Sequence, residues 1–274
     1  MPSLGAPEVA LPVPDAKLRW RVTGYDLSAD QFDRIGAESL NDLRRVLAFA
    51  GVDLKEIGRL LDFGCGCGRI MRHLASIAGK VELHGCDIEQ EPIDWNTANL
   101  PFASYVCNDG MPPLPYGDDF FDVVINHSVF THLPADYQDA WLAELSRVVK
   151  PGGHLALSVA GLHAFGGLVQ SYLDWPADPS ELKRAINEDG FLYIADDSWS
   201  GTDFPDFYHS AFHSPNYVMT HWAEFFTVVG YFPRAALEFQ DIVLLRNDVR
   251  KTSIRAETSP GSGRDNPEQL TRRP

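Results

Sequence analysis

The sequence predicts an α/β protein built on a doubly wound, mostly parallel sheet of seven strands. Short apolar runs alternate with segments of helical periodicity, which is the pattern of strands joined by crossover helices. The run at residues 121–126 is almost wholly apolar, as a parallel strand buried on both faces would be. Near the end of the chain, residues 226–231 and 237–245 are joined by a connection too short for a parallel crossover. The last strand is therefore expected to run antiparallel.

The beginning and the end of the chain are expected to lie outside the folded domain. Residues 1–16 are rich in proline and lack periodicity, which predicts a disordered arm. Residues 250–274 are polar, with Pro, Gly and Ser, and predict a disordered tail. Between them lies one domain over residues 17–249. Its first helix is expected at residues 30–50, where apolar side chains recur at helical spacing.

Strands and helices then alternate along the chain. The expected strands lie at residues 59–63, 81–86, 105–107, 121–126 and 155–159. The expected helices lie at residues 69–78 and 90–99, and from Pro134, which suits a first helical position, to Val148. Residues 151–153, Pro-Gly-Gly, predict the turn into the strand at 155–159.

The segment at residues 161–215 interrupts this alternation and is rich in aromatic and acidic residues. A short helix is expected from Pro179 to Asn187, with Asp178 as its N-cap. So many aromatic residues argue against disorder, and we interpret the segment as an insertion that covers the active site. A satellite packing cluster would use the same aromatic residues and is the alternative.

Composition excludes several classes of partner. The chain has 274 residues and a formal net charge of -15, so its long-range field repels phosphate backbones and anionic membranes. The N-terminus lacks the basic and apolar regions of a signal peptide, and no apolar run is long enough to span a membrane. We expect a cytoplasmic protein that binds neither nucleic acid nor membrane.

The four cysteines are expected to be reduced and to bind no metal. They are Cys65, Cys67, Cys86 and Cys107, all near the ends of expected strands. Neighbouring parallel strands could bring four thiols to one edge of the sheet, but the sequence has no Cys-x-x-Cys pair. A buried free cysteine usually behaves as a small apolar residue.

Three alternate glycines, Gly64, Gly66 and Gly68, follow the first expected strand. Glycine suits a tight turn that needs positive φ, and it lets a ligand lie against the main chain. The turn therefore predicts a site for a nucleoside-like ligand at the carboxyl ends of the strands. Nicotinamide-dependent oxidoreductases use a similar turn, so the motif alone leaves that class of enzyme open.

With its other motifs in place, the chain resembles the class I S-adenosylmethionine-dependent methyltransferases over residues 20–246. The resemblance rests on the stretches Leu61 to Gly68, Asp87, Asn108 to Tyr116, Phe121 to Val124 and Leu145 to Gly153, and on the closing antiparallel pair. It implies a Rossmann-like methyltransferase fold with S-adenosyl-L-methionine as cofactor. It also implies a cofactor site made of Asp62, Gly64, Cys65, Gly66, Gly68, Asp87, Ile88, Asn108, Asp109, Gly110 and His127.

The resemblance gives the acidic residues separate roles. Asp87 would accept both ribose hydroxyl protons. Asp62 would favour the cationic methionine end of the cofactor, although an acidic residue there can also cap the glycine loop. Asp109 with the backbone of Gly110 is the candidate for the adenine edge, and an ordinary Asp-Gly turn is its alternative. Arg21 is a candidate for the methionine carboxylate, or an ordinary surface arginine.

Two histidines follow the apolar strand at 121–126, in the stretch Asn126 to Pro134. Methylation of a hydroxyl needs a base, and histidine suits that role near neutral pH. His132 is the first candidate for this catalytic base, with a structural role as its alternative, and His127 is expected to contact the cofactor through its backbone. Four further histidines are reserve candidates for the base: His154, His163, His209 and His213.

The stretch Asn126-His127-Ser128-Val129 also narrows the acceptor. It does not match the Asn/Asp-Pro-Pro-Tyr/Phe motif of methyltransferases that act on nucleobase or glutamine nitrogens. Together with the acidic charge, this favours O-methylation of a small molecule, a sugar or a secondary metabolite. The alternatives are an NAD(P)-dependent oxidoreductase and a non-catalytic protein that binds S-adenosylmethionine. A homodimer is the candidate assembly.

Overall fold

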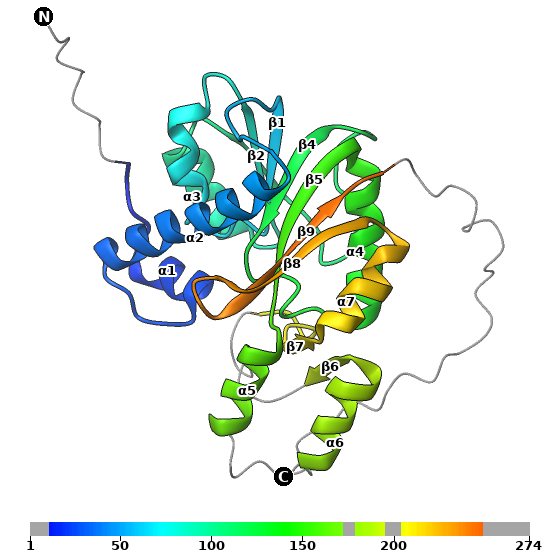
Figure 1. Ribbon diagram of the computed structural model, residues 1–274. Helices are drawn as coiled ribbons and strands as arrows, with labels where there is room; N and C mark the ends of the chain where they lie inside the picture. Colours follow the sequence, from blue (N-terminus) through cyan, green and yellow to red (C-terminus); the bar gives the residue numbers. More distant parts are fainter. Residues whose placement is uncertain (1–10, 172–178, 195–203, 249–274) are drawn as a thin grey trace, which may run out of the picture.

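The computed structural model describes residues 11–171, 179–194 and 204–248 (Figure 1). Its centre is a seven-stranded sheet with the strand order β3-β2-β1-β4-β5-β9-β8. The pairs from β3 to β5 are all parallel, and β9 runs antiparallel to both β5 and β8. The α/β fold class and the antiparallel last strand are therefore confirmed.

The main strands are β1 (Arg59–Phe63), β2 (Glu82–Asp87), β3 (Ser104–Cys107), β4 (Phe121–Asn126), β5 (Val149–Val159), β8 (Thr227–Ala236) and β9 (Gln240–Arg246). The helices are α1 (Ala16–Thr23), α2 (Ala29–Phe49), η1 (Met71–Ile77), α3 (Gln90–Asn99), α4 (Ala135–Val148), α5 (Leu162–Ser171), α6 (Pro179–Arg184), η2 (Ala185–Asp189), α7 (Pro215–His221) and η4 (Trp222–Glu224). A separate two-stranded sheet pairs β6 (Phe191–Ile194) with β7 (Ser210–His213).

Helices cover both faces of the main sheet, and the core is divided accordingly. On one face α2 and η1 pack against the strands, and on the other α4 and α7 do so (Figure 1). In β4, Val123 and Ile125 enter the first of these clusters, whereas Val124 enters the second. Both faces of this strand are buried, which explains its unbroken apolar sequence.

Several element boundaries differ from the sequence expectation. The helix expected at residues 69–78 is a shorter 3-10 helix that begins at Met71, because the glycine turn occupies the preceding residues. Pro134 is the N-cap of α4, with extended backbone, and not its first helical residue. β5 begins at Val149, since Val149 pairs with Phe121 before the register shifts. The Pro-Gly-Gly turn therefore lies within β5 as an irregularity.

The expected insertion contains more regular structure than predicted. Besides α6 it forms α5 and the β6–β7 hairpin, which the sequence did not reveal because each strand has only four residues. Its apolar side chains form their own cluster, which includes Leu182, Ile186 and Phe212. These side chains pack among themselves, as they would in the satellite cluster that the sequence left as an alternative, and the interpretation of the whole segment as a cover stays a prediction. Asp178 and the aromatic and acidic residues of 195–203 lie outside the described residues.

The N-terminal segment contacts the domain from residue 11 onward. Arg72 donates hydrogen bonds to the carbonyls of Leu11 and Pro12, each at 3.0 Å. Asp15 caps the N-terminus of α1 by accepting a hydrogen bond from the amide of Leu18. Within the predicted arm, 1–16, residues 11–16 thus contact the domain at a few points, although most of them are exposed and only Pro14 is buried. Residues 1–10 and the predicted tail, 250–274, lie outside the described residues.

Two features are absent from the described ranges. Within residues 11–171, 179–194 and 204–248, no helix is long and apolar enough to cross a membrane. The same ranges contain no group of three or more His, Cys, Asp or Glu residues placed to hold a metal ion.

Candidate active site

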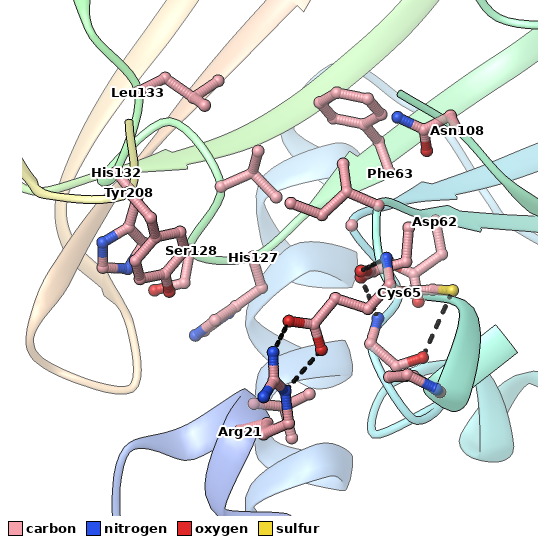
Figure 2. Close-up of a pocket in the computed structure, with 18 of the residues that line it drawn as sticks. Arg21, Asp62, Phe63, Cys65, Asn108, His127, Ser128, His132, Leu133 and Tyr208 are labelled. Atoms are coloured by element: carbon pink, nitrogen blue, oxygen red, sulfur yellow. Dashed lines mark hydrogen bonds and ion pairs between the residues drawn. The ribbon is translucent and has the colours of Figure 1, made fainter. Parts of the chain in front are cut away.

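A pocket lies at the carboxyl ends of β1, β2, β3 and β4, where the resemblance places the cofactor (Figure 2). We call it the central pocket. Of the predicted site residues, those that line it are Asp62, Gly64, Cys65, Gly66, Asp87, Ile88, Asn108, Gly110, His127 and His132. The structure therefore brings together the predicted acidic residues of β1 and β2 and the predicted histidines after β4.

The glycine turn forms the floor of this pocket. The amides of Gly64 and Cys65 both donate to the carbonyl of Cys86 at 2.9 Å, which ties the turn to the end of β2. Gly66 has φ of 49°, and a Cβ there would meet the side chain of Val22 at 2.2 Å. A larger residue would be strained and would push α1 away from the pocket.

Asp87 stands at the end of β2 and faces the central pocket. Its Oδ2 accepts from the amide of Gly66 at 2.8 Å, and its Oδ1 accepts from the amide of Glu89 at 3.1 Å. Burial raises its pKa to about 6, and the hydrogen bonds from backbone amides limit the rise. Each carboxylate oxygen has a second lone pair, so both can still accept a proton donor from a ligand.

Asp62 and Arg69 are neighbouring buried charged residues in the pocket wall, and both lack hydrogen-bond partners among the described residues for some of their polar atoms. Both are buried, and Oδ2 of Asp62 has no hydrogen-bond partner. Burial raises the pKa of Asp62 to about 7, although the neighbouring Arg69 lowers it. Burial also lowers the pKa of Arg69, whose guanidinium forms no hydrogen bond or ion pair with the described residues. Such groups are costly without a partner, so a charged ligand would stabilise both.

Arg21 lines the pocket from α1 but already has a carboxylate partner. Its Nε donates to Oε2 of Glu89 at 2.6 Å (Figure 2). Its guanidinium lies 4.8 Å from the centre of the Phe204 ring. Its predicted contact with a methionine carboxylate stays a prediction, because that ligand group would compete with Glu89. The ion pair joins α1 to the residues after β2, and the contact with the Phe204 ring joins α1 to the insertion.

His127 lies deep in the site, between Arg21 and Ser128 (Figure 2). Burial, together with the charge of Arg69, holds its pKa well below the ordinary value. The next residue, Ser128, has φ of 69°, so the chain reverses sharply just after β4. The amide of Ser128 donates to Oγ of Ser158 at 2.7 Å, and Gln240 donates to Oγ of Ser128 at 2.5 Å. These bonds hold the histidine loop against β5 and β9.

His132 is fixed by the insertion. Its Nδ1 lies 3.0 Å from the carbonyl of His209, and its ring stacks on Tyr208 with centroids 4.0 Å apart. Burial lowers its pKa to about 4, although the bond to the carbonyl raises it, so the imidazole is neutral near pH 7. A carbonyl can only accept, which places the proton on Nδ1 and makes Nε2 the basic nitrogen. The geometry suits a base.

Sequence reasoning missed the pocket residues contributed by the insertion and by α4. Phe204, Phe207 and Tyr208, which lie within residues 161–215, line the central pocket, so this part of the segment contributes aromatic rings to it. The ring of Phe207 packs against Gly110, and Trp141 donates to the carbonyl of Gly110 at 3.0 Å. The aromatic composition signalled a cover, but nothing in the sequence distinguished these rings from those of the satellite cluster.

Some predicted residues do not line the pocket. Asp109 is exposed and is absent from the lining, whereas its neighbours Asn108 and Gly110 contribute to it. Gly68 packs against Asn96 of α3 and against Leu100, the C-cap of that helix, so its close contact is with α3 and not with the pocket. The four reserve histidines also lie outside this lining, and the fully buried His213 is bonded to Gln138 at 2.9 Å.

A second cavity, of about 470 Å³, adjoins the central pocket. The two share the side chains that separate them: Arg21, Val22, Arg69, His127, Ser128, His132 and Tyr208. The second cavity is further lined by Thr23, Gly24, Tyr25, Leu27, Ile35, Ala236, Leu237, Phe239 and Gln240. Both histidines therefore lie where a ligand in one cavity would meet a ligand in the other.

Known proteins resemble this chain in sequence and in fold. Residues 61–157 match the family model described as a methyltransferase domain. A biotin biosynthesis bifunctional protein of Bordetella avium is 31% identical over 160 residues, which cover 56% of this chain and 32% of that protein. A fatty-acid O-methyltransferase of Mycolicibacterium smegmatis is 31% identical over 127 residues, covering 44% and 43% of the two chains. The chain thus matches less than half the length of either relative.

A solved structure agrees with the fold. A SAM-dependent methyltransferase of Methanosarcina mazei superposes with a TM-score of 0.51 at 21% sequence identity, covering 73% of this chain and 97% of that chain. The match extends beyond residues 61–157 of the sequence comparison and includes most of the described domain.

Proposed function

We propose that this chain, which contains a class I S-adenosylmethionine-dependent methyltransferase domain, methylates an oxygen atom of a small molecule, a sugar or a secondary metabolite. The observation that carries the proposal is the junction of two cavities. The glycine turn, Asp62 and Asp87 lie in one cavity, and the wall shared with the other holds His127 and His132. A methyl donor and an acceptor placed in these cavities would meet beside the two histidines.

The residues of the central pocket fit S-adenosylmethionine. Asp87 offers two oxygens to ribose hydroxyls, and the glycine turn lets the nucleoside approach the main chain. Asp62 has an unpartnered oxygen, which suits the ammonium group of the methionine moiety. The cofactor, when bound, supplies an electrophilic methyl group on a sulfonium. Asp109 is not needed for this arrangement, and we assign the adenine contact to Asn108 and Gly110 instead.

The chain's own contribution is alignment, exclusion of water and removal of a proton. Tyr208, Phe204 and Phe207 cover the pocket with apolar surface, which favours a reaction between ligands that have left water. Nε2 of His132 would take the proton of an acceptor hydroxyl as the oxygen attacks the methyl group. The stacked Tyr208 and the carbonyl of His209 hold the imidazole in the tautomer that this step needs.

Oxygen as the acceptor atom is supported by sequence and charge. The loop after β4 lacks the Asn/Asp-Pro-Pro-Tyr/Phe motif, and one relative is a fatty-acid O-methyltransferase by name. A formal net charge of -15 opposes binding of a polyanionic nucleic acid, so we propose a small-molecule acceptor. The proposed homodimer is a separate expectation, which a measurement of molar mass in solution tests.

Calorimetric titration tests the cofactor assignment. We expect S-adenosylhomocysteine to bind and NAD to bind far more weakly. Asp87→Asn should weaken S-adenosylhomocysteine binding roughly tenfold or more, because it replaces a charged acceptor. Asp94→Asn is the matched control, since Asp94 is exposed on α3 and outside the pocket. Tight binding of NAD, with no heat from S-adenosylhomocysteine, would contradict the proposal and favour the oxidoreductase.

A further inference from the structure

The two adjoining cavities differ in the balance of the charges that line them. The central pocket is lined by three carboxylates, those of Asp62, Asp87 and Glu89, and by the guanidinium groups of Arg21 and Arg69, so acidic groups outnumber basic ones there. Among the described residues that line the second cavity there is no carboxylate, and its charged side chains are Arg21 and Arg69. This separation is unusual in a chain with 38 acidic and 23 basic residues. It places a cation in the first cavity and disfavours one in the second.

The two arginines are not equivalent. Arg21 is neutralised by its ion pair with Glu89, whose side chain belongs to the central pocket and not to the second cavity. Arg69 is buried, lines both cavities, and has no hydrogen bond or ion pair with the described residues. Its guanidinium is therefore the group in this wall that most needs an anion.

The remaining wall of the second cavity is mostly apolar. Val22, Leu27, Ile35, Ala236 and Leu237 supply aliphatic surface. Tyr25 and Phe239 also line the cavity while being 73% and 51% exposed, so two aromatic rings stand where the cavity opens to solvent. Exposed rings of this kind are suited to an apolar ligand. Several neutral polar side chains also line the cavity, but Gln240 and Ser128 are hydrogen-bonded to each other and Thr23 donates to a main-chain carbonyl, which leaves them less capacity to bind a sugar.

We propose that the second cavity is the acceptor site and that it takes a hydroxylated carboxylic acid with an apolar body. The proposal rests on the proposed function and narrows its acceptor from sugars and secondary metabolites to one chemical class. The acceptor's carboxylate pairs with Arg69, its aromatic or alkyl body lies along the apolar wall, and its hydroxyl faces His132. An amine, which is cationic in water, finds no counter-charge there.

The reaction balances without a further reagent. The acceptor oxygen forms a bond to the methyl carbon, the bond between that carbon and sulfur breaks, and its electron pair stays on sulfur. The hydroxyl proton moves to Nε2 of His132, and the products are a methyl ether and S-adenosylhomocysteine. The carboxylate of the acceptor takes no part in the reaction, because its charge is engaged in the ion pair with Arg69.

A panel of hydroxylated aromatic and alkyl carboxylic acids, each beside its primary amide, tests the proposal with the full chain. The amide keeps the shape of the acid and removes its charge. We expect kcat/KM for the acids to exceed that for the amides by roughly tenfold or more, as for a hydrogen bond to a charged group. Neutral sugars should be poorer still. Amides that equal or exceed their acids would overturn the proposal, and so would the failure of every acid to bind the protein loaded with S-adenosylhomocysteine.

Variants of Arg69 locate the anion. Arg69→Gln should abolish the preference for acids, while Arg69→Lys should retain part of it. Arg34→Gln is the control, since Arg34 is exposed on α2 and lines neither cavity. If Arg69→Gln weakens S-adenosylhomocysteine binding and the preference for acids persists, Arg69 serves the cofactor and the inference is wrong. If the unaltered chain does not bind S-adenosylhomocysteine, the proposed function itself fails.

Discussion

Replacing Asp62 with asparagine should make the protein more stable and impair its cofactor site. Asp62 is 2% exposed, and its Oδ2 has no hydrogen-bond partner. Burial raises its pKa from 3.8 to about 7, with Arg69 lowering it and Asp87 raising it. One pKa unit corresponds to about 1.36 kcal/mol, so the ionised carboxylate costs the folded state roughly 4 kcal/mol at most. Asp62→Asn removes this cost and keeps the shape of the side chain.

The gain in stability should depend on pH in a defined direction. Between pH 4 and pH 7 the folded protein holds a proton on Asp62 that the unfolded chain has lost, so the contribution of Asp62 to stability falls as pH rises. The free energy of unfolding of Asp62→Asn, compared with that of the unaltered protein, should be similar near pH 4. The difference should grow to between roughly 1 and 4 kcal/mol above pH 7. Urea denaturation at a series of pH values measures it.

Asp122→Asn supplies a control of opposite sign. Burial raises the pKa of Asp122, but its ion pair with Lys150 and its hydrogen bonds from the amides of Arg59 and Gly58 leave that pKa lowered. Its neutralisation should therefore destabilise the protein, by about 1 to 2 kcal/mol. Asp62→Asn should also weaken S-adenosylhomocysteine binding by roughly tenfold or more. A variant at Asp62 that is less stable than the unaltered protein at pH 8, or that binds the ligand equally well, would refute the reasoning.

Three further substitutions probe the turn and the histidine loop. His132→Ala should lower turnover by about 10²-fold, and a loss below about tenfold would show that His132 is not the base. Because the pKa of His132 is about 4, its titration should not change the rate above pH 6. Gly66→Ala should weaken S-adenosylhomocysteine binding, because the new Cβ would meet Val22 at 2.2 Å. Gly79→Ala is the control, since a Cβ at Gly79 meets open space and should leave the affinity unchanged. Equal affinities of the two variants in a titration would contradict this prediction. Ser128→Gly should be more stable than Ser128→Ala by about 1 kcal/mol, since glycine accepts the φ of 69° without strain; denaturation midpoints in the reverse order would count against the strained loop.

The parallel sheet could be predicted because its strands follow local sequence patterns. β1 and β4 were expected with the bounds that they have, since each is an apolar run buried on both faces and ended by a polar or glycine-rich loop. The β6–β7 hairpin could not be predicted, because its strands are short and depend on packing with α5 and α6 rather than on an alternating pattern. Tertiary contacts decide the structure of such segments.

The site was predictable to the extent that it follows strand ends. Asp62, Asp87 and the glycines of the turn lie in the pocket because the carboxyl ends of parallel strands meet at one edge. The pairing of Arg21 with Glu89 joins residues far apart in the sequence, so no local pattern could reveal it. The exposed position of Asp109 could not be predicted either, since a loop motif predicts a turn but not the direction of each side chain.

Transfer of a labelled methyl group tests the central proposal most directly. The protein would be incubated with S-adenosylmethionine carrying a ¹³C-methyl group and with fractionated host metabolites, and the labelled products would be identified by NMR and mass spectrometry. We expect a methyl ether on a small acidic, largely apolar molecule, with no product from a protein that carries Asp62→Asn and Asp87→Asn together. Label found on nitrogen or carbon, or no labelled product from protein shown to bind S-adenosylhomocysteine, would contradict the account.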